Sequence, residues 1–191
     1  MPELPPIGFD RLLLVVTGSI NAAFLPPDLV WLRRAYPDLE ITTVITRTAS
    51  RFVTVDTLQG VTGGETVIDE WPPGGEAVHV RLQQWAQAIM VIPATLHYLA
   101  RLALGLGDSP SLLAIHCGTA PVVVAPSLPP GGWGSPVVER HVGDLRARGI
   151  TVIDPVPTYS LTTGEDDAHG PPPFLAVLGT LELARRKSAD T

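Results

Sequence analysis

The sequence predicts an α/β fold in which helices cover both faces of a doubly wound parallel sheet, giving three layers. Three observations predict it. Apolar runs rich in Val, Ile and Leu alternate along the chain with segments of helical spacing. Most of these runs are continuous, as in parallel strands that are buried on both faces. The composition, 45% hydrophobic and 17% charged, suits one compact domain spanning residues 1–191.

The strands are expected where the apolar runs lie, over residues 11–17, 40–46, 88–92, 122–125 and 151–153. Helices are expected between and after them, over residues 28–35, 95–106, 136–148 and 174–187. Pro27 stands where the first turn of a helix accepts proline. Two stretches rich in glycine and proline, residues 60–75 and 158–173, are expected to be loops. Their length favours a functional or mobile role.

Composition and charge exclude several classes of function. The net charge is −6 and no basic stripe is present, so we expect no binding to nucleic acid. The apolar run over residues 12–16 is too short to span a bilayer, and no basic signal region precedes it. We therefore expect a cytoplasmic protein with no membrane contact. A single cysteine, Cys117, excludes an internal disulfide; we expect it to be buried and inert, and we expect no metal site. The apolar composition favours a homo-oligomer.

Polar turns follow the first two strands, at the edge where doubly wound sheets bind their ligands. Gly18 and Ser19 follow the first strand, where glycine permits a tight turn and a serine beside backbone amides can bind phosphate. Thr46 and Thr48 follow the second strand. Neither turn matches the dinucleotide fingerprint or the Walker loop. An ordinary turn at Gly18, and N-capping of a short helix by Thr46 or Thr48, remain open.

A histidine, His79, stands 14 residues before the turn Pro93-Ala94-Thr95 that ends the third strand. The small residues of this turn would let a flat ring approach the backbone. An imidazole beside such a ring could exchange a proton near neutral pH. The alternative for His79 is a solvent-exposed histidine near the start of a helix. The pattern thus predicts a ligand site with a candidate acid/base.

On these residues the chain resembles the homo-oligomeric flavin-containing cysteine decarboxylases, particularly those that act on lanthipeptide precursors. The turn Gly18-Ser19-Ile20-Asn21 corresponds to the family's Ala-Ser-Ile-Asn. Thr46, Ala49 and Phe52 match its second-strand pattern, in which a hydroxyl residue, a small residue and Phe stand three residues apart. The distance from His79 to the turn is that from the family's catalytic histidine to its Pro-Ala-Ser-Ala-Asn-Thr turn.

Two further segments extend the resemblance toward the carboxyl end. Residues 126–133 correspond to the family's substrate motif, Pro-x-Met-Asn-x-x-Met-Trp, and residues 159–164 to its substrate-clamp segment. The chain departs from the family where His97 replaces the Asn of the turn motif. It departs again in the substrate motif, where Met, Asn and Met are replaced by Leu128, Pro129 and Gly132. Pro129 cannot donate a backbone hydrogen bond, so substrate handling is expected to differ.

The resemblance implies a Rossmann-like flavoprotein that binds FMN, with FAD also open, and that assembles into trimers and further into dodecamers. It implies that His79 is the catalytic base. It implies cofactor contacts from the three turns, at Gly18, Ser19, Ile20, Thr46, Thr48, Ala49, Phe52, Ala94 and Thr95. It implies substrate contacts at Leu128, Pro129, Trp133 and Tyr159. For Trp133 a place in the core remains the alternative.

The implied reaction is the oxidative decarboxylation of the C-terminal cysteine of a ribosomal precursor peptide. The product would be an aminoenethiol, from which an aminovinyl-cysteine ring can form. Residues 158–173 contain no cysteine, whereas phosphopantothenoylcysteine decarboxylases use a cysteine there to return electrons to the enethiol. This difference favours peptide modification. The alternatives are a phosphopantothenoylcysteine decarboxylase, a flavin prenyltransferase relative and a non-catalytic flavin-binding subunit.

Overall fold

The computed structural model describes residues 6–74 and 77–189. Its centre is a parallel sheet of six strands in the order β3-β2-β1-β4-β5-β6. The strands are β1 (Arg11–Val16), β2 (Glu40–Ile45), β3 (Thr66–Ile68), β4 (Ala88–Ala94), β5 (Val122–Pro126) and β6 (Thr151–Val152). The expected doubly wound α/β fold is confirmed, and all five expected strands are present within two residues of their expected ends.

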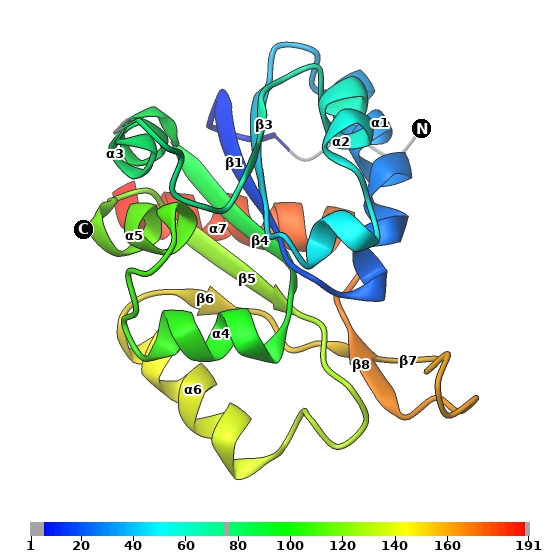
Figure 1. Ribbon diagram of the computed structural model, residues 1–191. Helices are drawn as coiled ribbons and strands as arrows, with labels where there is room; N and C mark the ends of the chain where they lie inside the picture. The colour runs from blue at the N-terminus through cyan, green and yellow to red at the C-terminus, as the bar shows by residue number, and fades with distance from the viewer. Residues whose placement is uncertain (1–5, 75–76, 190–191) are drawn as a thin grey trace.

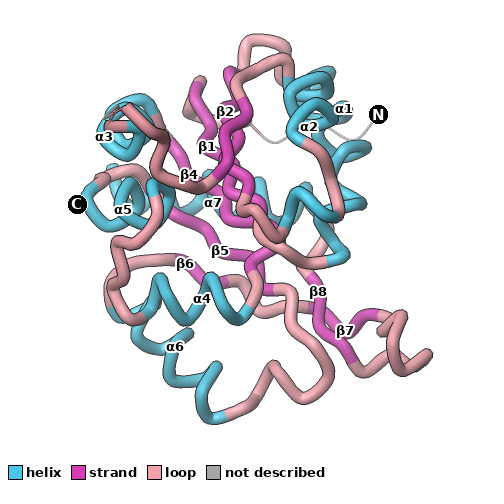
Figure 2. Tube along the Cα trace, in the orientation of Figure 1, coloured by secondary structure: helices cyan, strands magenta, loops and turns pink. Residues whose placement is uncertain are grey.

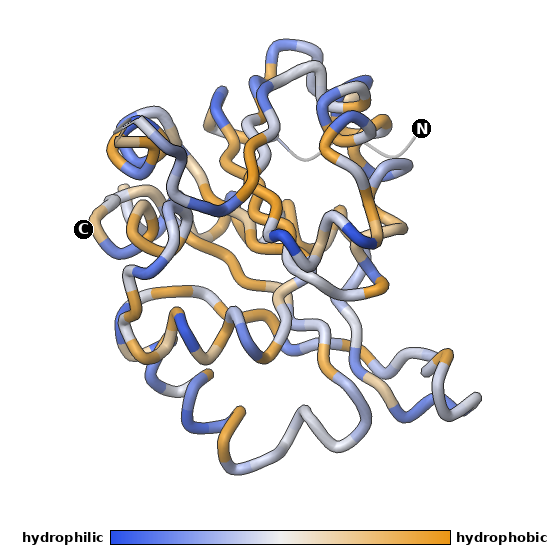
Figure 3. Tube along the Cα trace, in the orientation of Figure 1, coloured by the Kyte–Doolittle hydropathy of each residue, from blue (hydrophilic) through white to orange (hydrophobic). Residues whose placement is uncertain are grey.

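Helices cover both faces of the sheet (Figure 1). They are α1 (Leu25–Ala35), α2 (Val55–Thr62), α3 (Val78–Trp85), α4 (Leu96–Ala103), α5 (Pro110–Cys117), α6 (Pro136–Ala147) and α7 (Phe174–Ala189). Successive side chains of a strand point to opposite faces. Accordingly, Leu12 and Leu14 of β1 pack with α1, α2 and α7, whereas Leu13 and Val15 pack with α3, α4, α5 and α6. Figure 3 shows the strands between these layers as the most hydrophobic part of the chain.

The expected loop over residues 60–75 is wrong in part, because it contains the end of α2 and all of β3. The glycines that suggested a loop have other roles. Gly63 ends α2 in the left-handed conformation, with φ of 72°. At Gly64 an added Cβ would lie 1.9 Å from the carbonyl oxygen of Ile41, so glycine is needed for the chain to pass β2 this closely. Gly75 lies outside the described residues.

The expected loop over residues 158–173 is also wrong in part. It contributes to an antiparallel hairpin of β7 (Val156–Thr158) and β8 (Ala168–Gly170), which projects from one end of the sheet (Figure 2). Backbone hydrogen bonds tie β8 to the segment after β5: the Leu128 amide donates to the His169 carbonyl at 2.8 Å, and the reverse bond measures 3.1 Å. The hairpin is therefore attached to the chain beside the strand ends. Its mobility stays a prediction.

Three short helices, α2, α3 and α5, were not expected, and α4 ends at Ala103 instead of continuing to residue 106. Gly105, with φ of 73°, turns the chain between α4 and α5. Two 3₁₀ turns, Ile20–Phe24 and Ala49–Arg51, follow the first two strands. Across the described residues, we find no helix with the length and apolarity needed to cross a membrane.

Candidate functional site

The strand order reverses between β1 and β4, because the chain winds one way from β1 to β3 and the other way from β4 to β6. Ligands of doubly wound proteins bind outside the carboxyl ends of the strands at such a reversal. A cavity of about 760 Å³ opens there. Its wall consists of residues 18–21 after β1, 95–97 after β4, 127–130 after β5, and hairpin residues 158–162 and 168–169, with Phe24 at one side.

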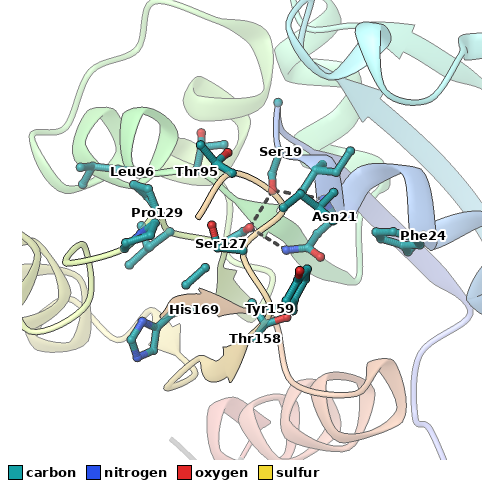
Figure 4. Close-up of a pocket in the computed structure, with 18 of the residues that line it drawn as sticks. Ser19, Asn21, Phe24, Thr95, Leu96, Ser127, Pro129, Thr158, Tyr159 and His169 are labelled. Atoms are coloured by element: carbon teal, nitrogen blue, oxygen red, sulfur yellow. Dashed lines mark hydrogen bonds between the residues drawn. The ribbon is translucent and has the colours of Figure 1, made fainter. Parts of the chain in front are cut away.

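Three polar side chains meet on this wall (Figure 4). The hydroxyls of Ser19 and Ser127 are 2.7 Å apart, and the side-chain amide of Asn21 donates to the Ser127 hydroxyl at 2.9 Å. Ser19 also caps the 3₁₀ turn by accepting from the Asn21 backbone N–H at 3.3 Å. The loops after β1 and β5 are thus joined by side chains that can also bond a ligand.

A second group of hydrogen bonds joins the loops after β1 and β4. The Thr17 hydroxyl donates to the Pro93 carbonyl at 2.7 Å, and the Thr95 amide donates to the Thr17 hydroxyl at 2.8 Å. Thr95 then caps α4 by accepting from the Tyr98 amide at 3.4 Å. The first amides of α4 have no acceptor within the helix, and they lie where the wall passes through Leu96 and His97.

The loop after β2 packs beside the first loop, as the sheet edge predicts. A Cβ added at Gly18 would lie 2.5 Å from the Thr48 methyl, so only glycine fits there without a shift. The Thr46 hydroxyl accepts from the Ala49 amide at 3.2 Å, whereas the N-cap residue of the 3₁₀ turn is Thr48, whose side chain makes no capping hydrogen bond. None of Thr46, Thr48, Ala49 and Phe52 lines the cavity. Their contact with a cofactor stays a prediction.

The remaining expected residues divide between this cavity and other places. Those that line it are Gly18, Ser19, Ile20, Thr95, Leu128, Pro129 and Tyr159. Ala94 is fully buried in the core. Trp133 lies in a separate cavity of about 320 Å³ beside α6, packed against the core. The structure therefore brings together seven of the fourteen residues named from the sequence.

His79 is not among the residues of the cavity wall. It lies in the first turn of α3, which packs against α5, away from the β7–β8 hairpin (Figure 1). The imidazole is half-buried, so it is not the exposed surface histidine of the alternative interpretation. Its Nδ1 is buried and has no hydrogen-bond partner among residues 6–74 and 77–189. The role of His79 as a base stays a prediction.

Several residues of the wall were not named as site residues from the sequence. They include Asn21, Ser127 and His97, together with the hairpin residues Thr158 and His169. Asn21 and Ser127 carried a signal, since each is a polar residue just beyond a buried strand. His169 carried none, because its place depends on the backbone pairing with Leu128. Its imidazole points away from Asn21 (Figure 4).

Among the residues that the structure describes, none in the wall is Lys, Arg, Asp or Glu. Its titratable side chains are His97, Tyr159 and His169. The expectation of a buried Cys117 is wrong: this thiol is exposed at the end of α5 and lies outside the cavity. Over residues 6–74 and 77–189, no three His, Cys, Asp or Glu side chains gather as a metal site. The cavity is thus an uncharged, hydroxyl-lined pocket with an apolar rim.

Comparison with known proteins places the chain in a family. The family model described as Flavoprotein matches residues 7–173. A cypemycin cysteine dehydrogenase (decarboxylating) from Streptomyces sp. is 36% identical over 135 residues, 70% of each chain. A coenzyme A biosynthesis bifunctional protein from Haemophilus influenzae is 31% identical over 76% of this chain, which spans 36% of that protein.

Solved structures agree in fold and in class. The cypemycin decarboxylase CypD superposes with a TM-score of 0.78 and 28% identity, covering 97% of this chain and 98% of that one. The FMN-dependent cysteine decarboxylase SpaF superposes with a TM-score of 0.76 and 30% identity, covering 92% and 97%. These matches extend over the sheet, the cavity and the hairpin. The chain therefore belongs to the flavoprotein family, among its flavin-dependent cysteine decarboxylases, and it is an enzyme.

Proposed function

We propose that this enzyme binds FMN and oxidatively decarboxylates the C-terminal cysteine of a ribosomal precursor peptide to an aminoenethiol. The observation that carries the proposal is the uncharged, hydroxyl-lined cavity at the strand reversal, bounded on one side by the hairpin. The curated relative with 36% identity is a decarboxylating cysteine dehydrogenase, and the SpaF neighbour is FMN-dependent.

The residues present fit a flavin. A cavity of about 760 Å³ lies within the usual range of about 300–1,000 Å³ for sites of this kind. Ser19, Asn21 and Ser127 offer hydrogen bonds to polar edges or to a phosphate, and the first amides of α4 add donors beside Thr95. Bound FMN would supply the two-electron oxidation that no side chain of the protein can perform.

The protein's own groups would carry the rest of the reaction. A base takes the thiol proton while the Cβ carbon is oxidised, and His79 is our candidate for it. In the resulting thioaldehyde the carboxylate is β to the C=S group, so carbon dioxide can leave and the electron pair passes to sulfur. Protonation of sulfur then gives the enethiol. The β7–β8 hairpin would cover the peptide end and exclude water.

We further infer that the enzyme is a homo-oligomer, in which the site is completed by a second copy. His79 does not line the cavity of its own chain, although the proposed chemistry needs a base there. Large apolar side chains are also exposed at the cavity rim, with Phe24 at 62% and Leu161 at 70% of their full exposure. Contact with another copy or with the peptide would bury them.

The test begins with the purified protein and the mass of any chromophore released on denaturation, which distinguishes FMN from FAD. A peptide ending in cysteine is then added, and a loss of about 46 Da, for carbon dioxide plus two hydrogens, is expected. The variant His79→Asn should stay yellow and release no carbon dioxide. A colourless protein that takes up no flavin would refute the proposal.

Two alternatives are separated in the same assay. Turnover of phosphopantothenoylcysteine and not of the peptide would favour a phosphopantothenoylcysteine decarboxylase. The 31% identical relative, a coenzyme A biosynthesis bifunctional protein, is the reason for testing this substrate. Inactivity of a yellow protein on both thiol substrates would argue against a decarboxylase. Inactivity on dimethylallyl phosphate with free flavin would argue against a prenyltransferase. The two results together would favour a non-catalytic flavin-binding subunit.

A further inference from the structure

Three consecutive residues after β3 are tied to two other segments, two of them to residues 108–111 and one to the loop after β2. The Asp69 carboxylate accepts from the backbone N–H and the hydroxyl of Ser111, at 2.8 and 2.7 Å, at the start of α5. Glu70 forms an ion pair with Arg47, in the loop after β2. Trp71 donates its indole N–H to the Asp108 carbonyl at 3.2 Å. We call residues 69–71 the strap. Its contacts with residues 108–111 and with the loop after β2 fix the position of the Trp71 ring.

The ring of Trp71 meets His79. The two ring centroids are 5.4 Å apart, and the planes lie at 77°, which is an edge-to-face contact. Trp71 keeps 46% of its surface exposed, so burial of its apolar area contributes little to holding the ring at this position. Since the strap holds the indole and the indole contacts the imidazole, Trp71 limits how the imidazole can turn.

The contact with Trp71 matters because of how the His79 imidazole is hydrogen-bonded. A functional imidazole is ordinarily oriented by a hydrogen bond at the nitrogen that does not react. At His79 the Nδ1 atom is buried and has no such partner within the part of the chain that the structure describes. Within the described residues no hydrogen bond at Nδ1 sets the ring orientation, and the edge-to-face contact with Trp71 is a contact that can do so.

We propose that Trp71 is a positioning residue that holds the His79 imidazole in its working orientation. The significance for catalysis rests on the proposed function of His79, whereas the contact itself does not. A leucine at position 71 keeps an apolar side chain but loses the aromatic edge and the N–H donor. A phenylalanine keeps the edge and loses only the donor.

The experiment measures both consequences on the full-length protein. Enzyme labelled with ¹³C at histidine Cε1 gives signals from five histidines, and the His79 signal is identified by its absence in His79→Asn. We expect Trp71→Leu to shift the His79 signal. On a peptide ending in cysteine, we expect this variant to lower kcat about 10-fold with KM unchanged. Trp71→Phe should restore most of kcat.

The matched control is Trp31→Leu, which removes another edge-to-face pair, that of Trp31 with Tyr36, at 6.3 Å. It should change neither the His79 signal nor kcat. An unshifted His79 signal in Trp71→Leu, or full activity of that variant while His79→Asn is inactive, would overturn the positioning role. Full activity of His79→Asn would instead refute the base proposed above, and with it the catalytic significance of Trp71, whatever the spectrum shows.

Discussion

Ser127 illustrates how a single residue links the fold to the site. It follows β5 directly and is 9% exposed, and its hydroxyl contacts both Ser19 and Asn21. These two residues belong to the loop after β1, two strands away in the sheet. One hydroxyl therefore joins the two sides of the strand reversal and faces the cavity at the same time.

We expect Ser127→Ala to weaken FMN binding about 10-fold, the equivalent of one hydrogen bond of about 1.4 kcal/mol. The Asn21 amide and the Ser19 hydroxyl lose their shared partner and no longer hold a fixed direction toward the cavity. Quenching of flavin fluorescence on titration measures the dissociation constant. Ser188→Ala is the matched control, because the Ser188 hydroxyl donates to the Ala184 carbonyl within α7, outside the cavity. Equal affinities for Ser127→Ala and the unmodified protein would contradict this role.

At the residue scale, the sequence was most informative where a polar residue follows a buried strand. Gly18, Ser19 and Thr95 could be found in this way, because the carboxyl ends of all parallel strands lie at the same edge of the sheet, where ligands bind. His169 could not be found, since it enters the wall through a backbone pairing that no local pattern encodes. For His79 the sequence supplied a spacing, but a spacing does not say which copy of the chain the imidazole faces.

At the scale of elements, the predictable ones are those whose own residues bury a continuous face. Strands such as β1 and β4 are buried almost throughout, and their apolar runs could be read directly. The strand β3, of three residues, and the helices α2, α3 and α5, of eight residues each, were not expected, because elements this short carry little periodic signal of their own. The equally short α4 was expected within a longer predicted helix, residues 95–106. The unexpected elements form because neighbouring elements pack against them. The residues of those neighbours are distant in the sequence, so no local pattern predicts the short elements.

The last helix, α7, shows how an element is anchored by charge. Glu182 is 5% exposed and accepts hydrogen bonds from Arg185, from Arg186 and from the Gly8 amide, at 2.8 to 3.0 Å. The hydrogen bond from Arg185, with help from Arg186 and Gly8, lowers the pKa of this carboxyl from 4.5 to about 2, against the opposing effect of burial. Glu182 thereby fastens the segment before β1 to α7.

We expect Glu182→Gln to reduce the free energy of unfolding at pH 7 by about 1–2 kcal/mol, less than the full pKa shift implies because the arginines are partly solvated. A lowered carboxyl pKa stabilises the fold above the unfolded-state value of 4.5, and this contribution is lost as the pH falls toward 2. The difference between the variant and the unmodified protein in urea should therefore shrink below pH 4.5.

The control for this prediction is Glu40→Gln, at an exposed position at the start of β2. It removes one negative charge without touching α7, and it should leave stability nearly unchanged at pH 7. A difference for Glu182→Gln that stays constant from pH 7 to pH 3 would show that shape, and not charge, accounts for its effect.

At the scale of the whole molecule, the cavity and His79 belong to different regions of one chain. The cavity lies where β1, β4 and β5 end and is bounded by the hairpin, whereas α3 packs on α5, away from the hairpin (Figure 1). The cavity of a single copy thus does not include the candidate base in its wall. In the homo-oligomer proposed above, each copy would lend its base to the site of a neighbour.

This arrangement predicts complementation between two inactive variants. His79→Asn keeps the cavity and lacks the base. Ala168→Trp keeps the base and places a large ring in the cavity from β8, which lies outside the core of the sheet. Each variant alone should be inactive on a peptide ending in cysteine. Co-expressed in equal amounts with different tags and purified through both, they should recover about a quarter to a third of the unmodified activity. Among all random assemblies one site in four combines an intact cavity with an intact neighbouring base, and removal of the unmixed assemblies raises this fraction to about one in three for a trimer.

A base acting within its own chain gives a different result. Every His79→Asn cavity would then lack its base, and every Ala168→Trp base would serve a filled cavity, so mixing could restore nothing. Persistent inactivity in purified mixed assemblies would therefore contradict a base supplied by a neighbouring copy. Recovered activity that disappears when the assembly is dissociated would locate the reaction between copies, and would explain why His79 does not line the cavity of its own chain.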